Sequence, residues 1–167
     1  MLARARTEDE DSHPLRLPDP LLPIRVRDRD RERRAVREDG RMPRRIGDVE
    51  GRDAVASVVR ADAATSVDRS TLALAVRYTL QLLAERAPGG TVEVRVPPFG
   101  AVQCIEGPRH TRGTPPNVVE TDAATWLGLA TGSLAWADVR AAGRVHASGQ
   151  RADLDGVVPV IDAARLA

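Results

Sequence analysis

Apolar residues recur at helical spacing in one long stretch of the chain. Leu72, Val76, Leu80 and Leu83 follow one another at intervals of three or four residues, which places their side chains on one face of an α-helix. Residues 87–90, Ala-Pro-Gly-Gly, contain the residue types that end helices. This stretch therefore predicts a helix, and three side chains before it are able to cap its start: Ser66, Asp68 and Ser70. A weaker helical repeat of valines lies at 48–60, with Gly51 opposing it.

Strict alternation of apolar and polar residues predicts strands after this helix. In 91–96 three valines alternate with Thr, Glu and Arg, which is typical of a strand with one buried face. Pro97 and Pro98 end that strand because neither proline has an N–H to donate. A second strand is expected at 101–105, with Val102 and Cys104 on one face, and a third at 118–121.

Short apolar segments separated by glycines fill the remainder of the chain. The Thr-Asp pair at 121–122 can cap a short helix that closes at Gly132, and Ser133 can open another that ends at Gly143. Residues 144–148 alternate again and predict a strand. A last apolar cluster is expected to lie against the sheet: Leu154, Val157, Val158 and Ile161.

The composition divides the chain into two parts. Residues 1–45 are dense in Arg and acids and contain little that can form a core, so we expect a disordered Arg/Asp-rich tail. Ten arginines against five acids in 25–45 make this tail locally basic. Residues 46–167 are expected to form one folded domain with its own core.

Charge and composition exclude several classes of protein. The formal net charge is +1 and only four aromatic residues are present, so neither a broad basic surface nor stacking platforms for nucleic acid are expected. The single cysteine excludes an intramolecular disulfide. Acids at 8–11 occupy the place where a signal peptide needs an apolar core. The most apolar run, 72–84, is too short to span a bilayer, and the cytoplasm is the expected location.

One long run carries a family resemblance. The segment VEVRVPPFGAVQCIEGPRHTRGTPPNVVETDAATWLGLATG, residues 92–132, resembles the sterol carrier protein superfamily, and within it the actinobacterial "sterol carrier family protein" group, also called the bacterial SCP orthologue domain. The acid at Asp122, the turns at Gly132 and Gly143, and the strand that ends at Gly149 are similar to the wider superfamily pattern. The resemblance covers roughly residues 70–162.

The resemblance implies an α/β (α+β) fold in which helices cover a curved, mainly antiparallel sheet. It also implies an apolar tunnel between the layers that holds acyl chains, sterols or other lipids. Some related bacterial proteins join such a domain to a metal-binding helical bundle with an enzymatic activity. This chain lacks the length and the histidines of that bundle, so we expect a non-enzymatic protein without a cofactor.

Large apolar residues are candidates to line a ligand cavity, although ordinary core packing is favoured for each of them because large apolar side chains are mostly buried. They are Phe99, Cys104, Trp126, Leu129, Trp136, Leu154 and Val158.

A basic loop supplies candidates for the polar mouth of such a cavity. Arg109, His110 and Arg112 follow Glu106 closely, and arginine binds carboxylate or phosphate groups through two donors. The alternative is an exposed loop with an internal Glu106–Arg109 ion pair. His110 beside Cys104 would form a nucleophile pair, but a lone cysteine in an apolar strand is typically a buried hydrophobic residue.

No metal site or catalytic residue is expected. The three histidines, at 13, 110 and 146, are scattered and have no cysteine motif near them. The expected function is carriage of a hydrophobic small molecule or lipid. The alternatives are a protein-interaction or regulatory module that keeps the fold without a ligand, and an accessory domain to a separately encoded enzyme.

Met42 offers an alternative start of the protein, because the folded domain is expected to begin a few residues later. If translation begins there, the intact mass of the native protein will lack residues 1–41. A mass that includes those residues would rule out this start.

Overall fold

The computed structural model describes residues 26–27, 45–61, 67–107, 117–162 and 166. The predicted tail lies largely outside the described residues, and so does its Met42 start.

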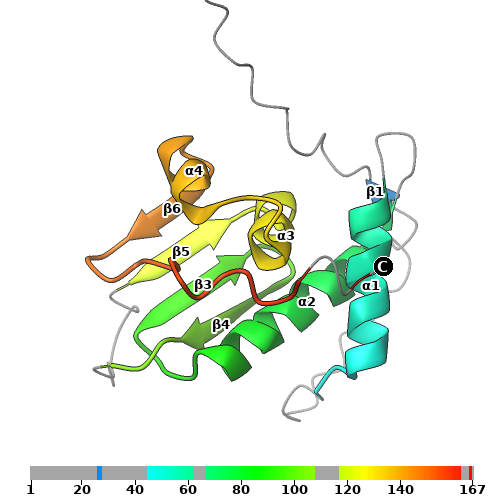
Figure 1. Ribbon diagram of the computed structural model, residues 1–167, viewed down its shortest axis with the longest axis horizontal. Coiled ribbons are helices and arrows are strands. Elements are labelled where there is room, and N and C mark those ends of the chain that lie inside the picture. The colour runs from blue at the N-terminus through cyan, green and yellow to red at the C-terminus, as the bar shows by residue number, and fades with distance from the viewer. Residues whose placement is uncertain (1–25, 28–44, 62–66, 108–116, 163–165, 167) are drawn as a thin grey trace, which may run out of the picture.

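A four-stranded sheet forms the centre of the fold, in the order β4-β3-β5-β6 (Figure 1). Its strands are β3 (Val92–Val96), β4 (Gly100–Cys104), β5 (Val118–Thr121) and β6 (Val145–Ser148). Strands β3 and β4 form an antiparallel hairpin, β5 and β6 are also antiparallel, and β3 and β5 are parallel. The predicted strands and the mainly antiparallel sheet are therefore confirmed.

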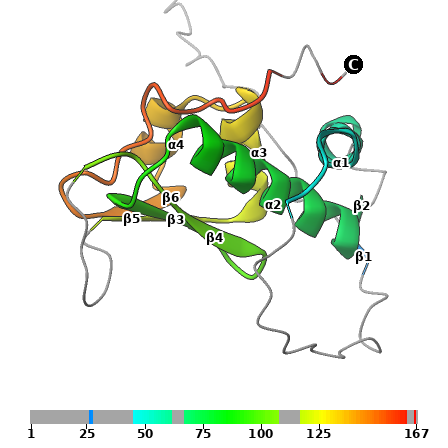
Figure 2. The ribbon, with the colours of Figure 1, turned by 90° about the horizontal axis from the view of Figure 1, so that it is seen from below.

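Helices cover one face of this sheet (Figure 2). They are α2 (Arg69–Arg86), α3 (Ala123–Thr131) and α4 (Trp136–Ala141), whereas α1 (Asp48–Arg60) lies beyond α2 and beside the sheet (Figure 2). Helix α1 packs against α2. A short parallel pair joins β1 (Val26–Arg27) to β2 (Val67–Asp68) just before α2 begins. The α+β class with a helix-covered sheet is confirmed.

Side-chain caps fix the starts of two helices. Asp68 accepts a hydrogen bond of 2.9 Å from the N–H of Thr71, and Asp122 accepts one of 2.9 Å from the N–H of Thr125. Each carboxylate satisfies a backbone donor that the first helical turn leaves without a partner. Gly132 ends α3 in the left-handed conformation, with φ of 79°, which glycine adopts without strain. Asp68 and Asp122 are thus the caps among the predicted candidates, and the predicted end of α3 at Gly132 is confirmed.

The predicted start of α4 at Ser133 is wrong. The helix begins at Trp136, and its N-cap is Ala135, which has no side-chain hydroxyl. The Ser133 hydroxyl instead donates to the carbonyl of Gly128, at 3.3 Å, in the last turn of α3. The Ser133 side chain therefore bonds back to α3 rather than opening the next helix, and the same Gly128 carbonyl also accepts from the N–H of Leu134, at 3.0 Å.

The core lies between the helices and the covered face of the sheet. All three valines of β3 are completely buried, as their alternation predicts. Trp126 of α3 is also completely buried, and its indole N–H donates to the Thr79 hydroxyl of α2 at 2.8 Å. That hydroxyl in turn donates to the carbonyl of Ala75, at 2.9 Å. Both buried polar groups are thus satisfied, and the bond holds α2 against α3.

The C-terminal apolar segment forms its backbone contacts with helices. The amides of Val160 and Ile161 both donate to the carbonyl of Ala130 in α3, at 2.9 and 3.0 Å. Arg86 of α2 donates to the carbonyl of Pro159, at 2.8 Å. This segment was expected to lie against the sheet, but its backbone bonds to α3 instead. The last turn of a helix has carbonyls without helical partners, and in α3 these can accept from the segment.

A close contact between α1 and α2 predicts a large effect of one methyl group. A Cβ at Gly51 would lie 2.2 Å from two carbon atoms of the buried Tyr78 ring. We expect Gly51→Ala to lower the free energy of unfolding by about 1–3 kcal/mol, because the ring has to move out of a packed core. Urea denaturation measures this change.

Gly47→Ala is the matched control, since a Cβ at Gly47 meets nothing within 4 Å. Its effect should stay below about 1 kcal/mol. Equal losses in the two variants would show that the Tyr78 contact does not set the cost, because helix propensity alone favours alanine over glycine within α1.

Candidate functional site

An open groove of about 920 Å³ runs along the outer face of α2. Strand β4, with the turn before it, borders the groove, and the segment that leads into α1 also lines it. Figure 1 shows where α2, β4 and α1 lie in the fold. Most of the lining residues are apolar. They are Ile46, Leu74, Arg77, Leu80, Gln81, Ala84, Glu85, Phe99, Gly100, Ala101 and Val102.

The helical repeat of α2 explains this second apolar face. Leu74, Arg77, Gln81 and Ala84 succeed one another at intervals of three or four residues, so they share one face of the helix. The completely buried residues of the same helix, such as Val76 and Leu83, occupy the opposite face. Helix α2 therefore contributes to the core on one side and to the groove on the other.

Glycine allows the hairpin to approach α2 closely. A Cβ at Gly100 would lie 3.3 Å from a methyl carbon of Leu80 and 3.8 Å from Cγ of Arg77. Larger side chains at this position would push the start of β4 away from the helix or fill the groove. The width of the groove at this point thus depends on a residue without a side chain.

Side-chain bonds to α2 hold Ile46 at the groove. The side-chain oxygen Oε1 of Gln81 accepts from the backbone N–H of Ile46 at 2.8 Å. The side-chain Nε2 of Gln81 donates to the backbone carbonyl of Ile46 at 3.2 Å. The Arg45 guanidinium forms two bonds to the Glu85 carboxylate, at 2.9 and 3.3 Å. The ion pair is exposed and contributes modestly. The paired bonds from Gln81 fix the backbone of Ile46, since they satisfy both of its polar groups.

Arg77 is the cation of the groove that is available to a ligand. Its Nε donates to the carbonyl of Phe99 at 2.9 Å, which fixes the side chain beside the hairpin turn. Among the described residues no carboxylate lies within ion-pair distance of Arg77. The two Nη groups can therefore meet an anionic group with paired donors.

Of the seven predicted cavity residues, only Phe99 lines this groove. Four others are completely buried in the core, and Trp136 is 6% exposed. Val158 is half-buried and packs against the core from the C-terminal segment. The four core residues are Cys104, Trp126, Leu129 and Leu154. A ligand-lining role for these residues remains a prediction.

The α2 face and Ile46 did not emerge from the sequence as site residues. One signal was present, because α2 carries Leu74 and Ala84 on the side opposite its core face. A helix with apolar residues on both sides needs a second partner for the outer one. No sequence pattern indicated that β4 would supply the adjacent wall.

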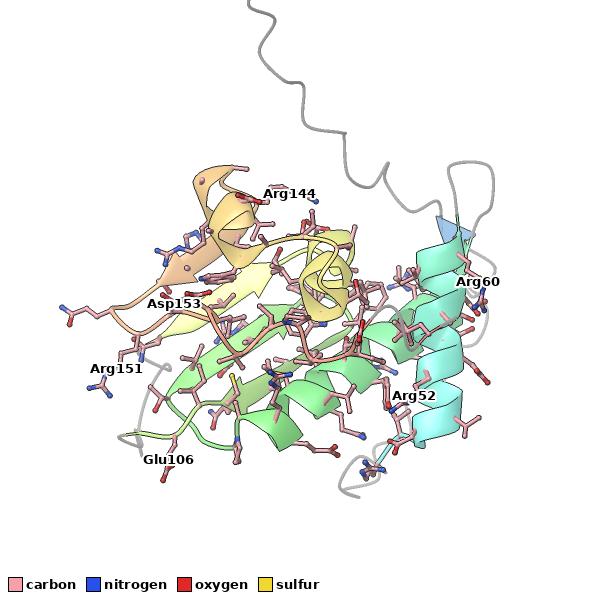
Figure 3. The ribbon with its side chains drawn as sticks, in the orientation of Figure 1. Arg52, Arg60, Glu106, Arg144, Arg151 and Asp153 are labelled. Carbon is pink, nitrogen blue, oxygen red and sulfur yellow. The ribbon has the colours of Figure 1, made fainter. Side chains whose placement is uncertain are left out.

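The predicted polar mouth lies mostly outside the described residues, because Arg109, His110 and Arg112 fall in 108–116. The predicted ion pair between Glu106 and Arg109 also involves this loop, so it too lies outside the described residues. Glu106 itself is exposed near the end of β4 (Figure 3). A headgroup site on this loop therefore remains a prediction.

Burial makes the Cys104 thiol a poor nucleophile. The residue is completely inaccessible to solvent, and desolvation raises the pKa of its thiol from 9.0 to about 11. The thiolate is the reactive form, so little of it exists near neutral pH.

Comparison with known protein families identifies the fold. A family model described as "Bacterial SCP ortholog" matches residues 68–160, more than half of the 167-residue chain. The chain belongs to the bacterial SCP ortholog family. The resemblance to sterol carrier proteins is thereby confirmed, while an actinobacterial origin remains a prediction. A search of curated proteins finds no match.

The bacterial SCP ortholog match covers α2 and β4 but stops short of Ile46. It begins at Asp68, the cap of α2, and ends at Val160 beside α3. The shared family region thus supplies most of the groove, and the segment held by Gln81 adds to it from outside the matched residues.

Two further classes of site were sought in the described part of the chain. Across it, no helix combines the length and the apolar character that a bilayer crossing requires. In the same residues there is no cluster of three or more His, Cys, Asp or Glu side chains that could hold a metal ion.

The Cys104 environment predicts slow thiol modification. At pH 8 we expect native Cys104 to react with Ellman's reagent at least about 100-fold more slowly than the unfolded chain, because a pKa higher by two units lowers the thiolate fraction by that factor. Cys104 is the only cysteine, so absorbance reports it alone. Similar rates in native buffer and in guanidinium chloride would contradict the buried position.

Proposed function

We propose that the groove along α2 binds a hydrophobic small molecule or lipid and that the protein carries this ligand without transforming it. The observation that supports the proposal is the groove itself, about 920 Å³ with mainly apolar walls. Ligand pockets in proteins commonly measure about 300–1,000 Å³. Membership of the bacterial SCP ortholog family is compatible with lipid carriage.

The driving force would be the burial of apolar surface. Each methylene group removed from water contributes about 0.8 kcal/mol, so several must be covered before binding exceeds the cost of immobilising the ligand. Leu74, Ala84, Phe99 and Val102 provide apolar contacts from both sides of the groove. An elongated ligand fits this arrangement better than a compact one, because the lining follows α2 for about three turns.

Arg77 supports a ligand with an acidic end. Its Nε is held by Phe99, which orients the remaining donors without neutralising the charge. A carboxylate or phosphate beside them would gain charge-assisted hydrogen bonds. The loop residues Arg109 and Arg112 remain candidates for the same role, although they lie outside the described residues.

A non-catalytic role agrees with the chemistry of the groove. Its polar members are an arginine, an amide and a carboxylate, and Glu85 is already paired with Arg45. A general base has to be available to accept a proton from the substrate. We propose a cytoplasmic carrier or sensor on these grounds, since the lone Cys104 suits a reducing compartment.

Native mass spectrometry before and after organic extraction tests the proposal directly. We expect a bound mass in the lipid range that extraction removes, followed by saturable binding of a fluorescent fatty acid or sterol analogue. Ala84→Phe should reduce the affinity for the analogue at least about tenfold, because the new ring occupies space in the groove.

Ala137→Phe is the matched control. It adds the same volume at an exposed position of α4, which lies near β6, at the other edge of the sheet from β4 (Figure 1). It should leave binding unchanged. A protein that carries no lipid and binds neither analogue would refute lipid binding, and equal losses in both variants would place the ligand elsewhere.

A further inference from the structure

Within the described part of the chain, strand β4 pairs only with β3 and forms an edge of the sheet. The N–H of Glu93 in β3 donates to the carbonyl of Asn117, at 2.9 Å, on the β5 side. In an antiparallel pair the residues alternate between facing their partner and facing away. Val94 therefore faces β4 and bonds to Val102, which stands opposite it. The main-chain groups of Ala101 and Gln103 are then turned outward.

The alternation ends at Ile105, which has a φ of 65° and whose carbonyl accepts from the N–H of Thr91, at 3.1 Å, just before β3. The N–H of Ile105 points away from β3 and donates to the carbonyl of Ala87, at 2.7 Å, just after α2. This bond closes one end of the edge, and the turn at Phe99 closes the other. Between them, Ala101 and Gln103 are exposed, and their outward N–H and carbonyl groups have no backbone partner among the described residues.

Among the described residues, this edge lacks the usual protection against pairing with another chain. Natural edge strands are blocked by charged side chains, prolines, bulges or a covering segment. Gly100–Cys104 contains no charge and no proline, and its pairing with β3 is regular. Four free backbone groups on a regular strand are a template for one further strand.

The groove gives this edge the features of a peptide site. Ala101 and Val102 of β4 line the groove together with α2. Alternate side chains of an added strand would point toward α2 and its apolar residues. A strand added antiparallel to β4 would end beside Gly100. Arg77 lies there, within 3.8 Å of a Cβ built on Gly100, and its Nη groups can receive a terminal carboxylate.

We propose that β4 and the groove bind the extended C-terminal segment of a partner protein, which adds to the sheet as a fifth strand antiparallel to β4. Apolar side chains at alternate positions contact α2, and the terminal carboxylate binds Arg77. This inference concerns a peptide ligand and does not depend on lipid binding by the same groove.

The proposal is tested with a fluorescein-labelled hexapeptide, Thr-Val-Thr-Val-Thr-Val, with a free C-terminal carboxylate. We expect saturable binding to the full chain by fluorescence polarisation. Gln103→Pro should weaken it at least about tenfold, because proline removes an outward N–H that the β3–β4 pair does not use. Gln103→Thr keeps that N–H and should bind as the unsubstituted chain does.

A second arm tests the carboxylate without altering β4. Amidation of the peptide C-terminus and Arg77→Gln should each reduce the affinity about tenfold, and the two changes together should cost no more than either alone. This arm decides the question if Gln103→Pro fails to fold. Gln103 is not part of the groove lining, so Gln103→Pro should leave binding of the fluorescent lipid analogue unchanged.

Three results would overturn the peptide proposal. The first is no measurable binding of the hexapeptide by the full chain. The second is binding that is insensitive to Gln103→Pro and to amidation. The third is a dimer, seen by light scattering, that Gln103→Pro dissociates while the hexapeptide remains unbound, because the edge would then belong to a second copy. Loss of lipid binding alone affects only the carrier function.

Discussion

Helix α2 lies along strand β4, and the rest of the structure depends on this contact. It is possible because Gly100 has no side chain where the strand starts, so the helix can pack within van der Waals distance of the hairpin. At the other end, the carbonyl of Ala87 accepts the outward N–H of Ile105. Helix α2 thus contacts the edge strand near its start at Gly100 and just after its end at Cys104. Its inner face completes the core, and its outer face becomes the floor of the groove.

Polar interactions in this protein mainly fix positions. Trp126 and Thr79 share a buried hydrogen bond that sets the position of α2 against α3. Gln81 binds both backbone groups of Ile46 and holds the chain beside the groove. Such bonds add little net stability in isolation, but a buried donor or acceptor left without its partner is costly. Alternative packings of the helices are therefore disfavoured.

The groove and the free edge offer two kinds of interaction at one place. Apolar walls bind any ligand that removes surface from water, and they discriminate weakly between ligands. The outward N–H and carbonyl groups of Ala101 and Gln103 bind only a partner with a backbone of its own. Arg77 can bind an anionic group on either ligand. The two ligand classes are thus distinguished by the main chain of β4 rather than by the apolar surface.

Local patterns in the sequence determined the elements and their ends. Alternating valines predicted β3, the spacing of apolar residues predicted α2, and a few neighbouring cap candidates located two helix starts, because each signal acts within a few residues. The family run also identified the fold that these elements form. The start of α4 could not be read in this way, since Ser133 bonds backward to α3 and not forward.

Tertiary structure alone decided the site. Leu74, Arg77 and Ala84 become groove residues only because β4 packs beside α2, and Ile46 joins them across 35 positions of sequence through Gln81. Equally, nothing local distinguishes a large apolar residue in a core from one in a cavity, and so Trp126 and Leu129 were natural candidates although the fold buries both. Whether a residue is buried or exposed depends on which elements pack against it, and these contacts form between residues far apart in the sequence.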